Sequence, residues 1–362
     1  MQSLHALVMA GGAGTRFWPA SRAARPKQFL PLVDGKPMIA ATIDRLDGLC
    51  GPDRVWVATS KRLGKPITKL LPALLPDRLI LEPEARDTAP CIALAAARIA
   101  AIDPQATMLV LPADHVITPV DAFQAMLRAG AAIADDGATL VTFGVPPTFP
   151  ATGFGYVECG AELPGQPLPC HAVRRFREKP DRATAEGFLR SGGFLWNSGI
   201  FAWRVDAILL AMRTADPELG AAADAMVAAA RKGDKAALQR AFLKAPKRSI
   251  DYAVMEKAAK VAVVRAPIRW DDVGSFPALA AIAAPDADGN VAVVADGASH
   301  LPLQSSGNVV YADGPRTVAL FGVRDLVVVA VDDAVLVCPK ERAQDLKALV
   351  EHVRNSGRTD LL

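Results

Sequence analysis

Short apolar runs alternate with longer amphipathic segments along the first 145 residues of the chain. The apolar runs occupy residues 5–10, 54–59, 78–81, 107–111 and 139–145. Apolar positions at helical spacing lie between them, at residues 37–49, 90–102 and 122–134. Buried strands that alternate with helices form parallel sheets with helices on both faces. The pattern therefore predicts an α/β fold with a Rossmann-like, mixed, mostly parallel sheet, whose ligand lies beyond the carboxyl ends of the strands.

The pattern changes after residue 146, where glycines, aromatic residues and prolines become frequent. This middle section is typical of a substrate-facing lobe inserted on the sheet. Asn197, Ser198 and Gly199 are predicted to form a small polar turn between aromatic residues. Residues 206–245 are alanine-rich and have a helical pattern that indicates ordinary packing.

A turn-rich linker at residues 284–290 separates the last part of the chain. Short strands are predicted at residues 308–312, 317–323 and 326–337, followed by a helix at residues 341–354. We therefore expect a catalytic domain over residues 1–284 and a small β-rich domain with a closing helix over residues 285–362. No repeat of fixed period is clear enough to indicate a solenoid.

The amino-acid composition limits which kinds of molecule the protein can bind. Of 362 residues, 51% are hydrophobic, and 41 lysines and arginines against 38 acidic residues leave a net charge of +3. The low charge, without long blocks of one sign, excludes a basic nucleic-acid tail and a polybasic membrane anchor. The longest apolar stretches are interrupted by charges and are shorter than the roughly 20 residues that span a bilayer. We expect a cytoplasmic protein that binds neither nucleic acid nor membrane.

Cysteine and histidine are unsuited to a metal cluster here. The five cysteines are scattered without a C-x-x-C pair, and the five histidines lie far apart. A disulfide framework and a zinc ribbon are therefore not expected. If a metal ion binds, oxygen ligands must hold it.

A glycine-rich loop directly follows the first apolar run and contains Gly11, Gly12 and Gly14. Such a loop can present backbone N–H groups to phosphate oxygens, although a purely structural turn is the alternative. The loop matches neither the Walker A motif nor the dinucleotide fingerprint. Arg16 and Lys27 favour the phosphate interpretation, because both cations could converge on a polyphosphate.

Two aspartates lie where a metal ion could be held. Asp114 follows the strand at residues 107–111, where a helix cap is the alternative interpretation. Asp272 follows Asp271, and if residues 269–273 are extended only one of the two can face the site. Two carboxylates together with phosphate oxygens and water would suit Mg²⁺.

A third group of residues suits a sugar phosphate. Glu178 can accept hydrogen bonds from hydroxyl groups, and the adjacent Lys179 can bind a phosphate. Asn197 offers a small polar side chain, while Gly153 and Gly155 permit close backbone approach. Each of these residues could equally serve loop or core-edge packing.

Together these motifs resemble the mannose-1-phosphate guanylyltransferases, also called GDP-mannose pyrophosphorylases, within the sugar-phosphate nucleotidylyltransferase family. The segments that support the resemblance are residues 11–19, 26–29, 82–90, 112–115, 176–180, 196–201, 249–252 and 270–274. Their order and spacing are preserved from residue 5 to near the C-terminus. The resemblance implies a nucleotide-diphospho-sugar transferase fold and the synthesis of GDP-mannose and diphosphate from GTP and α-D-mannose 1-phosphate.

The resemblance also implies roles for individual residues. Those implied to bind the nucleotide are Gly11, Gly12, Gly14, Thr15, Glu82, Arg86 and Thr88, and those implied to grip the triphosphate in catalysis are Arg16 and Lys27. Those implied to hold the mannose and its phosphate are Gly153, Glu178, Asn197 and Lys179. Asp114 and Asp272 are implied to bind Mg²⁺ or another divalent cation.

The sequence differs from the family pattern at Asp87 and in the isomerase domain that long family members carry. Asp87 stands where the family usually has asparagine, and a carboxylate cannot donate a hydrogen bond to a nucleotide. The phosphomannose isomerase domain of long family members does not follow residue 354, which predicts a single activity. The resemblance further implies that the C-terminal domain contributes to a homodimer.

Two other functions remain open at this stage. One is transfer to another hexose 1-phosphate or from another nucleoside triphosphate. The other is a regulatory subunit that senses nucleotide sugars without catalysis, although such a subunit could lose Arg16, Lys27 or either aspartate, and all four are present.

Overall fold

The computed structural model describes residues 3–12, 14–33 and 35–362. The chain forms two compact units, which we call the sheet unit and the repeat unit. The sheet unit comprises Met1–Gly11, Ile43–Pro112 and Ile117–Trp270, and the repeat unit comprises Gly12–Thr42, Ala113–Val116 and Asp271–Leu362. The chain therefore passes between the units several times, beginning within the glycine-rich loop.

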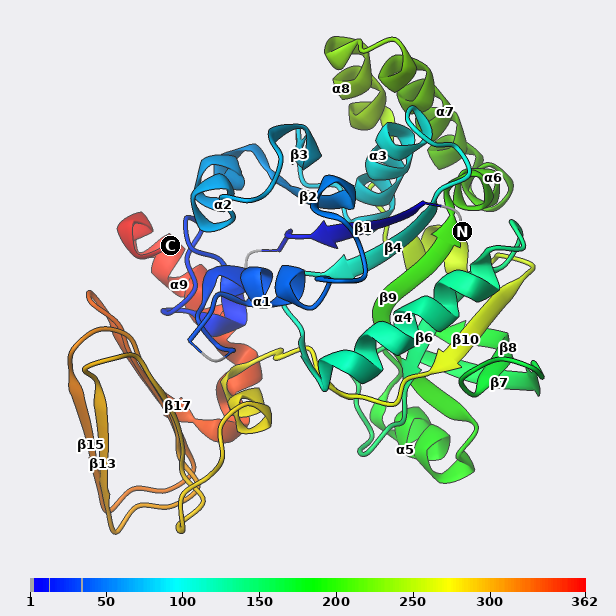
Figure 1. Ribbon diagram of the computed structural model, residues 1–362. Helices are drawn as coiled ribbons and strands as arrows, with labels where there is room; N and C mark the ends of the chain where they lie inside the picture. The colour runs from blue at the N-terminus through cyan, green and yellow to red at the C-terminus, as the bar shows by residue number, and fades with distance from the viewer. Residues whose placement is uncertain (1–2, 13, 34) are drawn as a thin grey trace. The chain divides into compact units, whose positions relative to one another are not determined.

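The described part of the sheet unit contains a nine-stranded sheet in the order β3-β2-β1-β4-β9-β6-β10-β8-β7 (Figure 1). Its strands are β1 (Leu4–Met9), β2 (Val55–Ser60), β3 (Leu79–Glu82), β4 (Thr107–Pro112), β6 (Leu140–Val145), β7 (Tyr156–Glu162), β8 (Cys170–Arg177), β9 (Phe194–Arg204) and β10 (Val261–Arg265). β1, β2, β3 and β4 pair in parallel, as do β6 and β10, whereas β9 runs antiparallel between β4 and β6. The predicted α/β class with a mixed sheet is confirmed.

Helices cover both faces of this sheet. On one face, α3 (Thr88–Ala100), α6 (Val205–Ala215) and α7 (Pro217–Arg231) share a buried apolar cluster with Leu7, Met108 and Phe201 of the strands. On the other face, α4 (Val120–Ala134) lies across β6 and β9, where Gly130 lets the helix approach the Phe143 ring (Figure 1). Other α-helices in the described part of this unit are α2 (Gly64–Leu70), α5 (Arg182–Ser191) and α8 (Lys235–Lys244). Alternation of side chains along each strand supplies both apolar faces.

Asn197, Ser198 and Gly199 do not form the predicted turn but lie inside β9. The pairing of β9 with β6 shifts its register between Thr142 and Gly144, and Gly199 has a φ of 70°. A bulge of this kind re-aims a side chain without ending the strand. The small polar residues therefore mark an irregularity in a strand.

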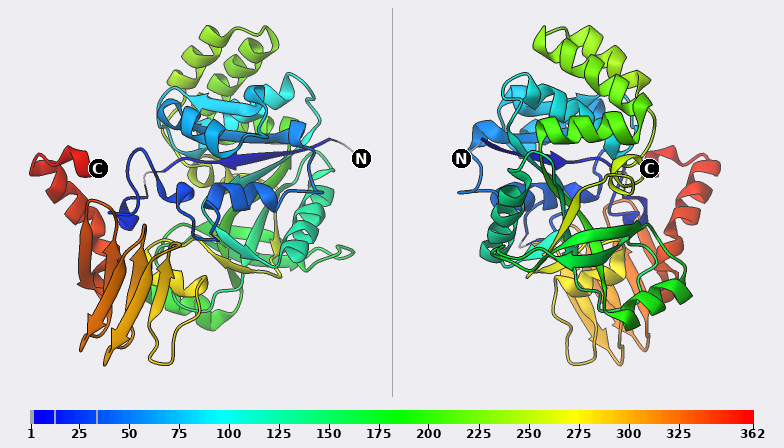
Figure 2. Two further views of the ribbon diagram at one scale, coloured as in Figure 1. Left: turned by 60° about the vertical axis from the view of Figure 1, so that its left-hand side comes forward. Right: turned by 90° about the vertical axis from the view of Figure 1, so that its right-hand side faces the viewer.

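The repeat unit contains stacked coils of 18 residues, a period that was not clear enough in the sequence to indicate a solenoid. β12 (Val291–Val294), β14 (Val309–Ala312) and β16 (Leu326–Ala330) pair in parallel, with Val291, Val309 and Val327 in register (Figure 2). β13 (Ser299–Leu303) and β15 (Thr317–Phe321) form a second parallel pair with the same offset. Only a few positions repeat in kind, which conceals the period in the sequence.

Asparagine side chains connect successive coils. The Asn308 side chain is completely buried, and its Nδ2 donates to Asn290 Oδ1 (2.9 Å) and to the carbonyl of Val323 (3.2 Å). Its Oδ1 accepts from the backbone N–H of Leu326 (3.0 Å). Asn290 precedes β12 and Asn308 precedes β14, so the two amides satisfy the backbone where each coil turns.

The end of the chain departs in detail from the expected elements. The predicted strand at residues 326–337 is two strands, because β16 turns back into the antiparallel β17 (Val335–Pro339). The predicted closing helix begins as a 3₁₀-helix (Lys340–Asp345) and continues as α9 (Leu346–Asn355). β11 (Arg269–Asp271), which pairs with β5 (Val116–Thr118), ends before Val273, whose φ of 45° is not extended. The division between the units falls within β5, β11 and α1 (Met38–Asp44).

Within the described residues, every helix is too short or too polar to span a bilayer.

Candidate active site

The glycine-rich loop brings Gly14 against Lys27. Gly12 and Gly14 have φ values of 97° and 58°, which favour glycine, while Ala13 lies outside the described residues. A Cβ on Gly14 would lie 2.7 Å from the Lys27 Cβ, so a side chain there would displace the lysine. The loop then continues into a short 3₁₀-helix, Thr15–Phe17, whose N–H at Phe17 donates to the Gly14 carbonyl (2.8 Å).

Lys27 joins two predicted site residues that are far apart in sequence. Its side chain is 8% exposed, and its Nζ donates to Asp114 Oδ2 (2.9 Å) and to the backbone carbonyl of Asp272. Burial acts to raise the pKa of Asp114, but the charges of Lys27 and His115 outweigh it and hold that pKa below its usual value. Asp114 is therefore an ionised carboxylate beside a nearly buried ammonium group.

The turn after β11 distinguishes Asp271 from Asp272. Asp271 Oδ1 accepts from the backbone N–H of Val273 (2.6 Å), and burial raises the pKa of Asp271. The Asp272 carboxylate instead borders Gly274, where a Cβ would lie 3.1 Å from its Oδ1. The same Cβ would lie 3.5 Å from Arg16 Nη1, so Gly274 leaves room for both side chains.

In the sheet unit, Glu178 and Asn197 meet beside Gly155. A Cβ on Gly155 would overlap Glu178 Oε2 and lie 3.5 Å from the Asn197 Cβ. Gly153, the glycine expected to face the sugar, has open space where its Cβ would be. Lys179 forms an ion pair with Glu178 (3.1 Å) and is 63% exposed, so its ammonium group is accessible to an anion.

The Asn197 amide is fixed by three protein groups. Its Nδ2 donates to Asp251 Oδ1 (2.8 Å), and its Oδ1 accepts from Thr142 Oγ1 (3.0 Å) and from the Gly199 N–H (3.3 Å). Burial, together with the charge of Glu178, raises the pKa of Asp251 to about 6. Asp251 was missed as a site residue, although it lies in one of the segments that support the resemblance.

The residues expected near the guanosine occupy the edge of the sheet after β3. Burial raises the pKa of Glu82 to about 7, partly offset by a hydrogen bond with Cys91. Arg86 Nη1 donates to the Ala245 carbonyl (2.7 Å), and its guanidinium also pairs with Glu84 (2.9 Å). Arg86 therefore makes structural contacts with two neighbouring segments.

The segment after Arg86 forms the start of α3. Asp87 has a φ of 68°, and its Oδ1 accepts from the Thr88 N–H (2.7 Å), so it caps the helix. The Thr88 hydroxyl accepts from the backbone N–H of Ile250 (2.8 Å), which places the start of α3 next to the segment that contains Asp251.

Two family profiles cover most of the chain. A profile described as Nucleotidyl transferase matches residues 5–289, and one described as MannoseP isomerase/GMP-like beta-helix domain matches residues 298–353. A mannose-1-phosphate guanylyltransferase of Escherichia coli strain K12 is 39% identical over 370 residues, 98% of this chain and 74% of that protein. The chain belongs to the nucleotidyl transferase family, in its mannose-1-phosphate guanylyltransferase branch.

Other relatives of this nucleotidyl transferase agree. Xanthan biosynthesis protein XanB of Xanthomonas campestris pv. campestris strain B100 is 40% identical over 364 residues, 99% of this chain and 75% of that protein. A crystal structure from Thermus thermophilus, described as a mannose-1-phosphate geranyltransferase, is 36% identical with a TM-score of 0.88 and covers 97% of this chain and 99% of its own. The resemblance inferred from the motifs is confirmed.

Nucleotidyl transferases generally use a divalent metal ion. Among the described residues, no group of three or more histidine, cysteine, aspartate or glutamate side chains could hold a metal by itself. Asp114 and Asp272, joined through Lys27, offer two carboxylates in the same unit. Two carboxylates suit a divalent cation such as Mg²⁺, whose remaining ligands would be phosphate oxygens and water molecules.

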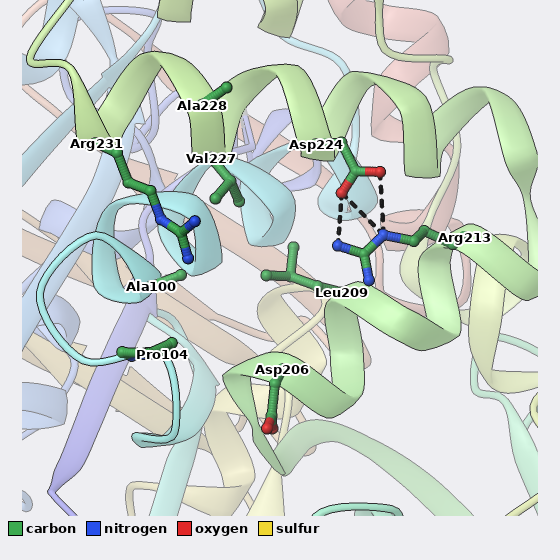
Figure 3. A pocket seen from close by; sticks show the side chains of 9 residues that line it. All are labelled: Ala100, Pro104, Asp206, Leu209, Arg213, Asp224, Val227, Ala228 and Arg231. Atoms are coloured by element: carbon green, nitrogen blue, oxygen red, sulfur yellow. Dashed lines mark hydrogen bonds and ion pairs between the residues drawn. The ribbon is translucent and has the colours of Figure 1, made fainter.

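A cavity of about 320 Å³ in the sheet unit lies apart from the predicted residues. Residues of α6 and α7 line it together with Ala100 and Pro104, and Arg213 of α6 makes a two-pronged ion pair with Asp224 of α7 (2.6 Å) at one side of it (Figure 3). None of the residues expected in the site lines this cavity. Because Asp224 already engages Arg213, the cavity adds nothing to the site.

Proposed function

We propose that the protein is a mannose-1-phosphate guanylyltransferase, which converts GTP and α-D-mannose 1-phosphate into GDP-mannose and diphosphate. The names of the relatives at 38% and 39% identity, mannose-1-phosphate guanylyltransferase, support the substrates. The chemistry rests on the position of Lys27. Its ammonium group lies between the Asp114 carboxylate and the Asp272 carbonyl, and its Cβ lies against Gly14 of the glycine-rich loop.

Such an arrangement suits phosphoryl-group chemistry without a general base. The attacking phosphate oxygen of the sugar phosphate is already anionic, so no proton has to be removed from it. The task that remains is to hold the two phosphate groups in line and to balance negative charge at the α-phosphorus. We assign charge stabilisation to Arg16 and Lys27, and binding of the nucleotide phosphates to Gly11, Gly12, Gly14 and Thr15.

The metal ion in this proposal is Mg²⁺, held by Asp114 and Asp272. When bound, Mg²⁺ would neutralise part of the charge on the phosphate oxygens of GTP. Asp272 is chosen over Asp271 because the Asp271 carboxylate accepts the Val273 N–H within the turn. The charges of Lys27 and His115 lower the pKa of Asp114 in spite of its burial. Asp114 is therefore ionised, as a ligand to a cation should be.

Recognition of the sugar and the base is assigned to the sheet unit. Glu178, Asn197 and Gly153 would hold the mannose hydroxyl groups, and the accessible Lys179 would bind the mannose phosphate. Glu82, Arg86 and Thr88 would lie near the guanosine. The Arg86 contacts with Ala245 and Glu84 make it a residue that shapes this region as well.

The expected assembly and domain division are part of the same proposal. We propose a catalytic domain over residues 1–284, a β-rich domain over residues 285–362, a cytoplasmic location and a homodimer. Leu301, Leu303 and Phe321 support the homodimer, since they form an apolar patch on the outer face of β13 and β15 and are 59%, 61% and 71% exposed.

Diphosphate release tests the proposal directly. Each of ATP, CTP, GTP and UTP is incubated with Mg²⁺ and either mannose 1-phosphate or glucose 1-phosphate. We expect the highest kcat/KM with GTP and mannose 1-phosphate. Activity confined to UTP with glucose 1-phosphate would overturn the assigned substrates, and no release from any pair would favour a regulatory subunit.

A further inference from the structure

Gln344 lies at the centre of a hydrogen-bonded link in the repeat unit. It belongs to the 3₁₀-helix Lys340–Asp345 that follows the last strand of the repeat. Its Oε1 accepts from Arg16 Nη1 (2.9 Å), and its Nε2 donates to Ser275 Oγ (2.9 Å). One amide thus connects residues that are 328 and 69 positions away in the sequence.

The chemistry of the two partners fixes the orientation of this amide. A guanidinium group only donates hydrogen bonds, so the Gln344 oxygen must face Arg16 and the nitrogen must face Ser275. Ser275 is buried and immediately follows Gly274, the residue that borders both Arg16 and the Asp272 carboxylate. Gln344 therefore holds Arg16 at the segment that contains Asp272.

Further residues from the end of the chain hold the same loop. Trp18 Nε1 donates to the Leu361 carbonyl (2.8 Å), and the Arg22 guanidinium forms an ion pair with Asp333 (2.6 Å). The loop is consequently anchored at Trp18 and at Arg22, while Arg16 itself is exposed. An exposed arginine has many rotamers, and its ordering costs conformational entropy unless a partner restricts it.

We propose that Gln344 is a positioning residue that aligns the Arg16 guanidinium with the triphosphate. This inference rests on the proposed function, because it takes Arg16 as a triphosphate ligand. A neutral amide restricts the guanidinium without cancelling its charge. A carboxylate at the same position would form an ion pair with Arg16 and would compete with the phosphate groups.

Two substitutions of Gln344 distinguish the loss of Arg16 alignment from the effect of an added negative charge. In Gln344→Ala, we expect kcat to fall about tenfold while the KM for mannose 1-phosphate stays within about twofold, because Arg16 loses its alignment but keeps its charge. In Gln344→Glu, we expect the KM for GTP to rise about tenfold, because the new carboxylate competes for Arg16. Lys347→Ala, an exposed change in the next turn, is the matched control and should leave both values unchanged.

A double-mutant cycle tests whether Gln344 acts through Arg16. The dissociation constant for GTP with Mg²⁺ is measured by calorimetry in the original protein, Arg16→Ala, Gln344→Glu and the double variant. Once Arg16 is absent, Gln344→Glu should have no further effect. An equal loss with and without Arg16 would overturn the inference, as would an unchanged affinity in Gln344→Glu.

Amide hydrogen exchange tests the positioning role of Gln344 without depending on enzymatic activity. Peptides covering residues 14–25 should exchange faster in Gln344→Ala than in Lys347→Ala, with unchanged melting temperatures, whether or not diphosphate is released. Equal exchange in the two variants would refute the positioning role. A protein that lacks activity with every substrate pair but shows faster exchange would refute only the proposed function.

Discussion

Burial and a neighbouring carboxylate make Asp251 an unusually weak acid. Burial is the larger cause and the charge of Glu178 the next, and together they raise the pKa of Asp251 from 3.8 to about 6. The charged form of Asp251 is therefore costly in the folded protein, although Asn197 Nδ2 donates to it. Asn197, which is proposed to bind the sugar, is therefore held in place at the expense of stability near neutral pH.

Asp251→Asn should stabilise the protein in a pH-dependent way. Since the folded pKa lies above the unfolded one, the original protein loses stability as pH rises from about 4 to about 6. The variant lacks this loss, so its free energy of unfolding should exceed that of the original by about 1 to 3 kcal/mol at pH 8 and by much less at pH 4. Urea unfolding at both pH values measures this, with the exposed Asp135→Asn as control. An equal difference at both pH values would contradict the assignment.

Asp271 and Asp272 provide a matched pair for the metal proposal. Asp272→Asn should lower kcat roughly a hundredfold or more, because an amide is a poorer ligand for Mg²⁺ than a carboxylate. Asp271→Asn keeps an oxygen that can accept the Val273 N–H and should retain most activity. Diphosphate release at several Mg²⁺ concentrations measures both. A larger loss from Asp271→Asn would exchange the two roles.

At the scale of elements, stability of the repeat depends on buried amides as well as on apolar stacking. Val291, Val309 and Val327 align in successive coils and fill the interior. The turns between coils leave backbone groups buried or partly buried, and Asn290 and Asn308 hydrogen-bond to them. The glycine-rich loop depends on a comparable local constraint, since Gly14 has no room for a side chain beside Lys27.

Asn308→Ala should destabilise the protein by about 2 to 4 kcal/mol. The substitution leaves the Val323 carbonyl and the Leu326 N–H without their side-chain partner in a partly buried turn, and each group left unsatisfied costs about 1 to 3 kcal/mol. Chemical unfolding monitored by circular dichroism measures the loss. Asn355→Ala at the exposed end of α9 should change stability by less than about 0.5 kcal/mol. Similar effects from the two variants would show that the amide link contributes little.

At the scale of the whole molecule, the order of residues in the chain differs from their grouping in space. Arg16, Lys27, Asp114 and Asp272 belong to the repeat unit together with the C-terminal coils. Glu82, Glu178 and Asn197 belong to the sheet unit. The residues proposed to stabilise charge and hold the metal ion and those proposed to recognise base and sugar are therefore built on different units.

Phe321→Glu should weaken the proposed homodimer. Phe321 lies in register with Leu303 on the outer face of the repeat, and a charge there would have to be buried in a contact between two copies. Sedimentation velocity should show a dimer for the original protein and a shift towards monomer for the variant. Leu210→Glu, at a position 56% exposed on α6, is the control and should remain dimeric. A monomeric original protein would refute the assembly.

Local patterns predicted several strands of the sheet and the residue types of the candidate site. Apolar runs correctly predicted β1, β2, β3, β4 and β6, because strands that are largely buried, as all of these except β3 are, have few polar residues. The 18-residue repeat was not predicted, because inward positions accept valine, alanine or tyrosine equally and only the turns require specific residues. The turn expected at Asn197 was a bulge, since small polar residues suit both.

The sequence by itself determined the α/β class, the family and the residue types suited to phosphate, metal and sugar, because these depend on local spacing and on motifs. Tertiary structure alone decided that Lys27 bridges Asp114 and Asp272, that Asp271 closes a turn, and that Asp251 and Gln344 hold Asn197 and Arg16. Most of those relations join residues tens to hundreds of positions apart. Hydrogen bonds, burial and charge act over a few ångströms in space, and separation along the chain does not reveal which distant side chains come that close.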